Sequence, residues 1–417
     1  MRSSVALFIL AGLTMPGPLS AAETASPTKP ERPQVEAAGP RGPVGPDVPL
    51  TDAEARQLAK RVAVEGRTAV AVQNACDRAA KEGVPTVFLP AGTYVLETTV
   101  RVGGGLVLLG AGSASVVEAG KRDTHLFLVD GDRVRLTRLK LQGADTTPSE
   151  ANDTFGVVVE GKKNVRVDHC ELLGFSYATD FTAEAAAQVD HCSIHDNPRD
   201  GLGYGVALYS GACVLVADND FSQCRHALAS NGDLDWSSPK RVGKYVHKAG
   251  VRKTHWEFIH NRVHGDDRTK YQLCAVDTHP GMDGTFVVEG NLFENLTIAV
   301  GIRDGSGLIR RNLFRSLASG KDYRPAVAIS ITYDTHNGVP VENAMPHDIE
   351  VEENAFQGAD EKPYEKYRIG KAERITLDGK LVPETRTQSP GSPPAMPRLQ
   401  EMGEEGILIV REPAPAK

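Results

Sequence analysis

The stretch FVVEGNLFENLTIAVGIRDGSGLIRRNLF, residues 286–314, holds two copies of one short pattern. Each copy, FVVEGNLF and GLIRRNLF, has alternating apolar residues, a turn, a small polar residue and a closing apolar residue. Further copies extend from Val165 to Phe356, and their polar position is occupied in turn by Cys170, Cys192, Asn219, Asn261, Asn291, Asn312 and Asn354. The successive steps are 22, 27, 42, 30, 21 and 42 residues. A unit of roughly 20 to 30 residues indicates a solenoid, in which each coil buries its apolar face against its neighbours.

The recurring asparagine indicates how the coils stack. A buried amide without a partner costs about 1 to 3 kcal/mol, so its repeated use beside apolar residues requires a reason. Equivalent asparagines in stacked coils, about 4.8 Å apart, can hydrogen bond to one another as a ladder. Because each copy is a short alternating strand followed by a turn, the pattern favours β-coils over helical repeats. We therefore expect an all-β fold, a single-stranded parallel β-helix.

The N-terminus has the composition of a signal peptide. Residues 1–22 carry Arg2, the apolar stretch from Val5 to Met15, and the small residues Ser20, Ala21 and Ala22. This order of charge, apolar core and small residues is typical of an export signal, and predicts a secreted or periplasmic protein. In the 417-residue chain, a net charge of −7 gives no indication of nucleic-acid binding. No apolar run reaches the roughly 20 residues of a membrane span.

The chain divides into four predicted parts. The signal peptide is followed by residues 23–50, rich in Pro, Gly and Ala, which predict a flexible linker. The β-helix domain is expected over residues 51–358. It begins with a helix capped by Thr51 and Glu54 and extending to near Gly66, and then a second, amphipathic helix that covers the open end of the stack. Residues 359–417, where the repeat is absent, are expected to form a C-terminal cap or tail.

Three segments carry a family resemblance. The second helix contains AVQNACDRAA (residues 71–80), and it is followed by TVFLPAGTY (86–94) and LVLLGAG (106–112). Together they resemble the N-terminal part of pectate-lyase-like right-handed β-helix proteins, and with the later coils the resemblance covers residues 68–358. It implies a right-handed β-helix with an N-terminal capping helix. Such proteins mostly cleave or modify acidic polysaccharides in a groove, although the scaffold also serves hydrolases, epimerases and adhesins.

The chain has six cysteines. Cys170 and Cys192 occupy ladder positions of adjacent coils, where their Cα atoms would lie within disulfide reach. A small buried thiol also packs well there. We expect free buried thiols.

Catalytic residues are expected where the repeat is violated, because the stack does not require them. In QCRHALASNG (223–232), Arg225 and His226 stand where other copies have small or apolar residues. Consecutive strand residues point to opposite faces, so at most one of the two faces a groove. A surface Arg beside a His at the edge of the core is the structural alternative.

The segment CAVDTHPGMDG (274–284) is a second departure. When the alanines of three successive coils are aligned, three polar residues fall in one column: Asn231, His279 and Arg303. Asp277 lies on the same face as His279. An imidazole with a pKa near 6.5 suits a general base, and a neighbouring carboxylate can orient it.

The order Asp-x-His and then Arg is similar to the site of β-helix mannuronan C5-epimerases, in which a DPHD motif supplies the base and an Arg neutralises the sugar carboxylate. This sequence has DTHP, and Asp283 is the nearest candidate for the second Asp. A structural Asp-His turn is the alternative, since DTH recurs at Asp334 to His336.

A long step between coils adds a basic, aromatic loop. Residues 231–253 include Lys240, Arg241, Lys244 and Lys248, interleaved with Trp236 and Tyr245. In an acidic chain this loop is expected to attract a polyanion and to stack sugars on its rings. An ordinary solvated loop is the alternative.

These features lead to one hypothesis. His279, steadied by Asp277, abstracts the C5 proton of a uronate, Arg303 or Arg225 stabilises the developing enolate, and His226 or Tyr245 is the acid. The expected activity is that of a polysaccharide lyase acting on an acidic polysaccharide, by a monomer, with no cofactor or metal ligand assigned. A C5-epimerase, an inverting hydrolase using Asp277 and Asp283, a non-catalytic glycan-binding protein and the use of Ca²⁺ remain open.

Overall fold

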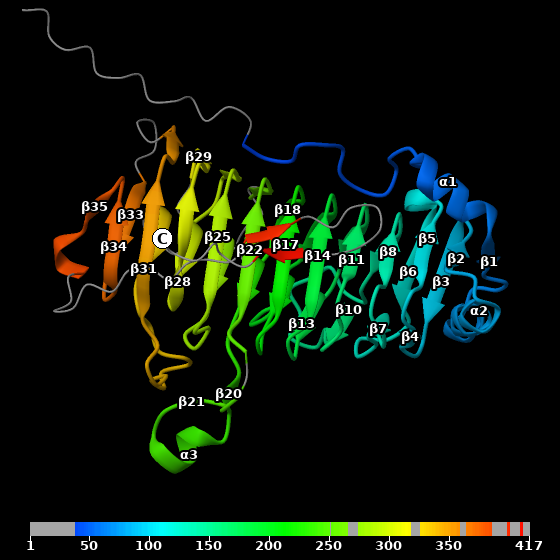
Figure 1. Cartoon of the computed structure of the whole chain (residues 1–417), viewed down its shortest axis with the longest axis horizontal. Coiled ribbons are helices and arrows are strands. Elements are labelled where there is room, and N and C mark those ends of the chain that lie inside the picture. The colour runs from blue at the N-terminus through cyan, green and yellow to red at the C-terminus, as the bar shows by residue number, and fades with distance from the viewer. Residues whose placement is uncertain are drawn as a thin grey trace, which may run out of the picture. The chain divides into compact units, whose positions relative to one another are not determined.

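Three long sheets of parallel strands form the protein (Figure 1). The computed structural model describes residues 38–250, 252–265, 274–317, 326–358, 364–385, 398–400 and 409–411. Strands that neighbour each other in a sheet come from successive coils, so each coil contributes one strand to each sheet. The predicted parallel β-helix is therefore confirmed. The predicted signal peptide, residues 1–22, lies outside the described residues.

The first sheet consists of β1 (Arg61–Ala63), β2 (Thr86–Leu89), β5 (Val107–Gly110), β8 (Arg135–Thr137), β11 (Val165–Asp168), β14 (Ala186–Asp190), β17 (Cys213–Ala217), β22 (His255–Ile259), β25 (Thr285–Glu289), β28 (Gly305–Arg310), β31 (Pro346–Glu352), β34 (Glu373–Leu377) and β35 (Lys380–Leu381). The second sheet consists of β3 (Gly92–Leu96), β6 (Ser115–Ala119), β9 (Lys140–Gln142), β12 (Glu171–Leu173), β15 (Ser193–Asn197), β18 (Asp220–Cys224), β23 (Arg262–His264), β26 (Leu292–Glu294), β29 (Leu313–Arg315) and β32 (Ala355–Gln357). The third sheet consists of β4 (Val100–Val102), β7 (Phe127–Val129), β10 (Phe155–Glu160), β13 (Tyr177–Thr182), β16 (Tyr204–Leu208), β19 (His226–Ser230), β24 (Val276–Thr278), β27 (Ile298–Ile302), β30 (Val327–Ile331) and β33 (Glu365–Ile369).

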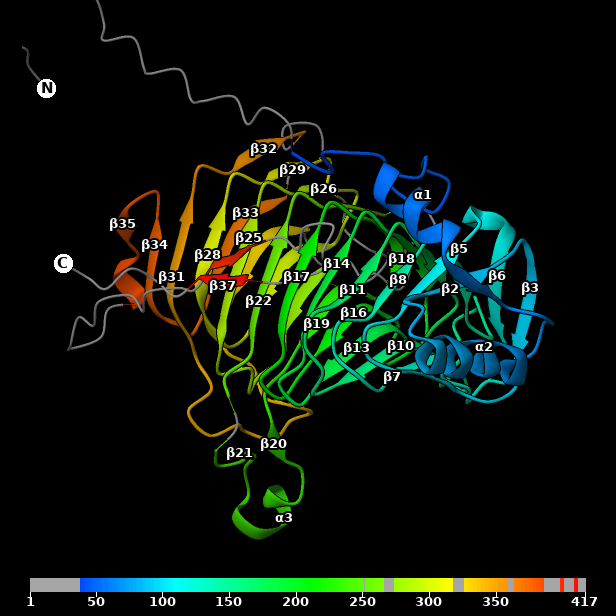
Figure 2. The same cartoon turned by 45° about the vertical axis from the view of Figure 1, so that its right-hand side comes forward.

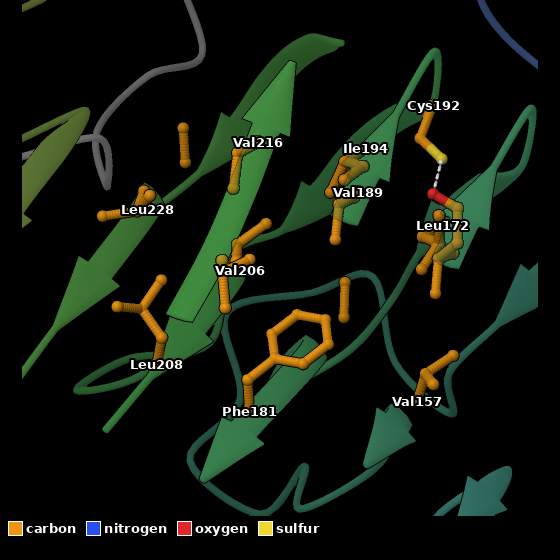
Figure 3. Close-up of a cluster of buried hydrophobic side chains, with 14 of the residues drawn as sticks. Val157, Leu172, Phe181, Val189, Cys192, Ile194, Val206, Leu208, Val216 and Leu228 are labelled. Atoms are coloured by element: carbon orange, nitrogen blue, oxygen red, sulfur yellow. Dashed lines mark hydrogen bonds between the residues drawn. The ribbon is translucent and has the colours of Figure 1, made fainter. Parts of the chain in front are cut away.

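Apolar side chains from all three sheets fill the interior of the coils. In Figure 3, Val189 and Val216 come from the first sheet, Ile194 from the second, and Phe181 and Val206 from the third. All five are fully buried. Since every coil presents the same alternation, one continuous core runs through the stack. The six cysteines are free and buried, as expected.

The asparagine ladder is present. Nδ2 of Asn261 donates to Oδ1 of Asn291 at 3.2 Å, and Nδ2 of Asn291 donates to Oδ1 of Asn312 at 2.9 Å. Each amide also donates to a strand carbonyl, as Asn291 does to Phe258 at 2.8 Å. The residue before each ladder position has a positive φ, for example 52° at His260. One left-handed residue thus makes the corner between the first and second sheets, and the following amide pins it.

Helices cover the N-terminal end of the stack (Figure 2). α1 (Asp52–Ala59) has the predicted capping box of Thr51 and Glu54. It ends earlier than Gly66, because residues 61–63 pair with β2 as a strand. α2 (Ala69–Glu82) buries its apolar face against the first coils and ends at Gly83, whose φ of 66° is left-handed.

Residues 38–50 differ from the expected flexible linker. The amide of Gly39 donates to the carbonyl of Gly290, and that of Gly45 to the carbonyl of His191, both at 2.9 Å. Arg41 forms an ion pair of 2.6 Å with the buried Asp218. These three partners are corner residues between the first and second sheets. A Pro- and Gly-rich segment with few apolar side chains is thus fixed through its backbone and through the charged side chains of Arg41 and Asp47.

The stack also continues past residue 358, the predicted end of the domain. β33 pairs with β30 and β34 with β31, so a further coil follows β32 without the asparagine signature. Near the C-terminus, the amide of Leu399 donates to Oε1 of Glu257 at 2.6 Å, and its side chain joins an apolar cluster on the outside of the first sheet. β36 (Arg398–Gln400) and β37 (Ile409–Arg411) form a hairpin there. In the part of the chain that is described, no helix is both long and apolar enough to cross a membrane.

Candidate active site

The outer face of the third sheet carries the residues that the sequence singled out. Ala229 pairs with Asp277, and Thr278 pairs with Ile302 in the next coil. The predicted alignment of the coils is therefore correct, and Asn231, His279 and Arg303 follow these strands in successive coils. Backbone bonds fix two of them: the amide of His279 donates to Ser230 O at 2.8 Å, and that of Arg303 to Oγ1 of Thr278 at 2.7 Å.

Asp277 is the centre of the charged cluster. Arg303 donates from Nε to Oδ1 at 3.1 Å and from its terminal nitrogen to Oδ2. Nε2 of His279 lies 3.3 Å, and Nε2 of His226 3.4 Å, from the same Oδ2. Burial opposes ionisation of Asp277, but His226, His279 and Arg303 outweigh it and lower the pKa of this carboxyl. The side chain thus stays ionised although it is 4% exposed.

His226 lies beneath this cluster. Its Nδ1 is 2.5 Å from the carbonyl oxygen of Cys274, which can only accept, so Nδ1 carries the hydrogen. Burial lowers the pKa of His226 to about 3, against the opposing effect of Asp277. The imidazole is neutral, is 2% exposed and has its Nε2 directed at Asp277. Of the two adjacent residues, only Arg225 lines the cleft, and His226 is covered.

A cleft of about 530 Å³ covers the cluster. Its floor is formed by residues of five successive coils, from β13 to β27. The lining residues are Tyr177, Thr182, Gly201, Leu202, Tyr204, Tyr209, Ser210, Arg225, Asn231, Gly232, Asp233, Trp236, His279, Arg303, Thr335, His336 and Asn337. Of the five predicted catalytic residues, His279, Arg303 and Arg225 line this cleft, while Asp277 and His226 support it from below.

Tyr204 is a cleft residue that the sequence reasoning missed. Its hydroxyl accepts a hydrogen bond from Arg225 at 3.1 Å, and its ring lies 6.1 Å from that of His279. Burial raises the pKa of Tyr204, and Arg225 opposes the increase. Tyr204 pairs in register with His226, so extending the alignment of the coils back to β16 would have placed it beside the site.

The basic loop contributes less than predicted. It forms β20 (Leu234–Asp235), α3 (Ser238–Val242) and β21 (Val246–His247), which project from the stack (Figures 1 and 2). Trp236, 55% exposed, lines the cleft. The other predicted substrate-binding residues lie outside the lining: Lys240, Arg241, Lys244, Tyr245 and Lys248.

Acidic partners explain this difference. Arg241 pairs with Asp235, Lys244 with Glu342 at 2.6 Å, and Lys248 with Asp233 at 2.9 Å. Tyr245 packs against the rings of Trp236 and His336, with centroids 5.4 and 5.3 Å away. The positive charges of Arg241, Lys244 and Lys248, which were predicted to attract a polyanion, are therefore each paired with a carboxylate.

Residues 333–345, which follow β30, form another part of the cleft wall. The ring of His336 lies 6.3 Å from His279 and 5.2 Å from Trp236. Oδ2 of Asp334 lies 4.0 Å from the guanidinium of Arg303. The second DTH sequence is thus part of the same site.

Among the residues that the structure describes, His226, Asp277 and His279 could hold a metal ion, since their donor atoms lie within 4.8 Å of one another. Two imidazoles and a carboxylate suit zinc better than Ca²⁺, which prefers oxygen ligands. Arg303 already donates to both carboxylate oxygens, so a metal ion would face a guanidinium at contact distance. The arrangement disfavours a metal.

Comparisons with known proteins address the fold. No curated protein matches the sequence. Solved structures with a similar fold include an alginate lyase from Paenibacillus sp. str. FPU-7, with 12% identity, coverage of 74% of this chain and 98% of that chain, and a TM-score of 0.48. The family 28 exopolygalacturonase of Yersinia enterocolitica has 12% identity, coverage of 75% and 76%, and a TM-score of 0.43. A GH87 α-1,3-glucanase catalytic domain has 12% identity, a TM-score of 0.44 and coverage of 76% of this chain, but this chain spans only 58% of it.

The family comparison is more direct. Residues 127–356 match the model described as "Right handed beta helix region". The match covers more than half of the chain and includes every predicted catalytic residue. The handedness expected from the resemblance is thus confirmed, and the protein belongs to the right-handed β-helix family.

Proposed function

We propose that the protein is an exported enzyme that acts on an acidic polysaccharide by abstracting the C5 proton of a uronate, with β-elimination as its reaction. The supporting observation is the contact between Asp277 and His279, 3.3 Å apart, beside Arg303 in a cleft. The composition of residues 1–22 supports export.

His279 is the proposed base. A carboxylate only accepts hydrogen bonds, so Asp277 holds the hydrogen on Nε2 of His279 and leaves the lone pair on Nδ1. The side chain of His279 is 15% exposed and borders the cleft, where it can meet a sugar. Asp277 stabilises the imidazolium that forms once the proton is taken.

Arg225 is the better candidate to neutralise the substrate carboxylate. It donates to two neutral oxygens, Gly201 O at 3.0 Å and the hydroxyl of Tyr204 at 3.1 Å. The guanidinium of Arg303, in contrast, is engaged by the carboxylate of Asp277. An arginine that keeps its charge uncompensated can bind a sugar carboxylate and stabilise the enolate, whereas Arg303 chiefly positions Asp277.

Tyr204 replaces Tyr245 and His226 as the proposed acid. Tyr245 lies outside the lining, and His226 is 2% exposed with its hydrogen bound to Cys274. Tyr204 lines the cleft, although only 3% of the residue is exposed, and its raised pKa keeps the hydroxyl protonated. The hydroxyl donates to the carbonyl oxygen of Gly201 at 3.3 Å, a long bond from which its hydrogen can turn to the leaving oxygen. In the elimination, His279 takes the C5 proton, a C4–C5 double bond forms, the C4–O bond breaks, and Tyr204 protonates the leaving oxygen.

The direct test is a panel of polymannuronate, polyguluronate and polygalacturonate. Absorbance of unsaturated uronate should appear with the wild-type protein and disappear in His279→Ala. His347→Ala is the matched control, because His347 pairs with Asp348 on β31, away from the cleft, and should keep full activity. Inversion at C5 without absorbance would instead establish the epimerase alternative. No change in any polyuronate by the folded wild-type protein would contradict both reactions.

The hydrolase alternative has less support. Inverting hydrolysis requires two carboxyl groups about 6.5 to 9.5 Å apart across the sugar. Asp277 is enclosed by Arg303 and two histidines, and Asp283 pairs with Lys253 at 2.9 Å outside the cleft lining. A reducing-sugar assay without unsaturated product would favour a hydrolase. A non-catalytic glycan-binding protein would bind equally well after His279→Ala and yield no product.

A further inference from the structure

The two ends of the cleft are built differently. Beyond Arg303, residues 335–337 lie in the lining, and Asp334 approaches the guanidinium to 4.0 Å. In the other direction, towards the N-terminal coils, the lining residues lie on strands of the third sheet or directly after them. Tyr204, Tyr177 and Thr182 are examples. One end is therefore crossed by a loop, and the other follows the outer face of the sheet.

The loop that crosses the cleft is held firmly. Val341 and Ala344 are buried against Leu234 of the basic loop. Two backbone bonds join the loops: Tyr245 donates to Pro340 and Glu342 donates to Tyr245, both at 2.9 Å.

The loop is also tied to the coil stack. The amide of Met345 donates to Oδ1 of the buried Asp304 at 2.9 Å. His336 sits between Trp236 and His279, with ring centroids 5.2 and 6.3 Å away. A substrate cannot displace this loop without breaking these contacts.

The open direction carries a row of aromatic rings on successive coils. Ring centroids are 5.1 Å apart from His226 to Tyr204 and from Tyr204 to Tyr177, and 4.5 Å apart from Tyr177 to Phe155 and from Phe155 to His125. The ring of His226 is covered, but Tyr204 and Tyr177 border the cleft. From the coil of Arg303 to that of Tyr177 there are four strand spacings, or roughly 19 Å, which accommodates several sugar rings of an extended chain. Aromatic side chains commonly line sites that take such ligands.

We infer that the cleft receives one end of a polysaccharide chain, with the terminal sugars against His336 and the rest of the chain running over Tyr204 and Tyr177 towards the N-terminal coils. The enzyme then acts from chain ends, and His336 is a specificity-determining residue. This inference rests on the proposed function, since it places the reacting sugar over His279, next to the closed end.

The test measures how many protein molecules bind to one polysaccharide chain. His279→Ala, which prevents turnover, is titrated calorimetrically with oligomannuronates and oligogalacturonates of increasing defined length and with the two polymers. A closed cleft gives one protein per chain at every length, and the affinity stops rising once the chain reaches the coil of Tyr177. A groove open at both ends gives a number of bound proteins that increases with chain length, and this result would overturn the inference while leaving the proposed function intact. Failure of every uronate to bind would contradict both.

Product analysis supplies a second readout. The wild-type protein should release short unsaturated fragments from the start while the viscosity of the polymer falls slowly. His336→Ala, combined with His279→Ala in the titration, should bind more than one protein per polymer chain, and alone it should yield longer fragments. His347→Ala is the control and should behave as wild type in both assays. An unchanged stoichiometry and product pattern in folded His336→Ala would overturn the role of this residue.

Discussion

Asp277 and Arg303 lie on adjacent coils of the third sheet and form a two-bonded ion pair, with Nε and Oδ1 3.1 Å apart. The carboxylate is 4% exposed, so its charge depends on this partner and on the contact with His279. The carboxyl group of Asp277 is therefore kept ionised by a residue of the adjacent coil.

The first prediction concerns this pair. Asp277→Asn leaves the guanidinium of Arg303, 28% exposed, without its main counter-charge, and should lower the free energy of unfolding by about 2 kcal/mol. Arg303→Gln should cost a similar amount, because it leaves a buried carboxylate. Urea denaturation of both variants and of the double variant gives the coupling energy. Additive losses would show that the two side chains do not depend on each other.

Tyr204→Phe tests the acid. The variant keeps the ring and loses the hydroxyl that accepts from Arg225. We expect kcat to fall by about 10²- to 10⁴-fold, the usual contribution of a general acid, with KM changed little. Tyr245→Phe, outside the cleft lining, is the matched control. Equal kcat values for Tyr204→Phe and wild type would exclude the hydroxyl from the proton transfer.

The buried His226 predicts a pH dependence of stability. Its pKa is about 3 in the folded protein, below the ordinary value of 6.5, so the unfolded chain binds the proton more readily. Stability contributed by neutral His226 is therefore complete above pH 6.5 and is lost as the pH falls towards 3, at up to about 1.4 kcal/mol per pH unit. His226→Gln should show a shallower slope in this range by thermal denaturation, and identical slopes would contradict the assignment.

Asn291→Ala interrupts the asparagine ladder. The amide of Asn261 loses its acceptor, and the carbonyl of Phe258 loses a donor. Each buried group left without a partner costs about 1 to 3 kcal/mol, so the free energy of unfolding should fall by at least that amount. Asn74→Ala, on the exposed face of α2, should be close to neutral. A neutral Asn291→Ala would mean that the ladder does not stabilise the stack.

Chelation should leave the activity unchanged. Arg303 supplies positive charge to both oxygens of Asp277, the carboxylate that a metal bound by His226 and His279 would share. Incubation with excess EDTA followed by desalting should preserve the initial rate on the polyuronate substrate. Loss of the rate, restored by zinc, would show that the three residues bind a metal during catalysis.

The fold could be predicted because the recurring pattern fixes which residues of successive coils pair with one another. The steps between ladder asparagines and the alignment of Ala227, Ala275 and Ala299 were sufficient to bring His279 and Arg303 to neighbouring coils. The resemblance of the N-terminal segments supplied the handedness, which the local pattern does not encode. Tyr204 escaped notice because a tyrosine at a strand position does not violate the pattern.

Other differences arise from contacts between distant residues. Glu342, which neutralises Lys244, lies 98 residues further along the chain. Likewise, the docking of residues 38–50 depends on backbone carbonyls of corner residues, which the composition of the segment does not reveal. Neither contact follows a repeat, so local pattern reasoning could not find it.

The corner between the first and second sheets has a further consequence for how this protein can change. At the five asparagine positions this corner is held by one left-handed residue and one amide, which leaves little tolerance for added length. The first 42-residue step instead places its extra residues between the third and first sheets, before β22. The second divides them between residues 316–326, before β30, and residues 332–345, before β31. Loops can therefore be lengthened or exchanged at the other two corners while the ladder of asparagines is unchanged, so relatives can acquire new substrates through insertions there without a change in the coils.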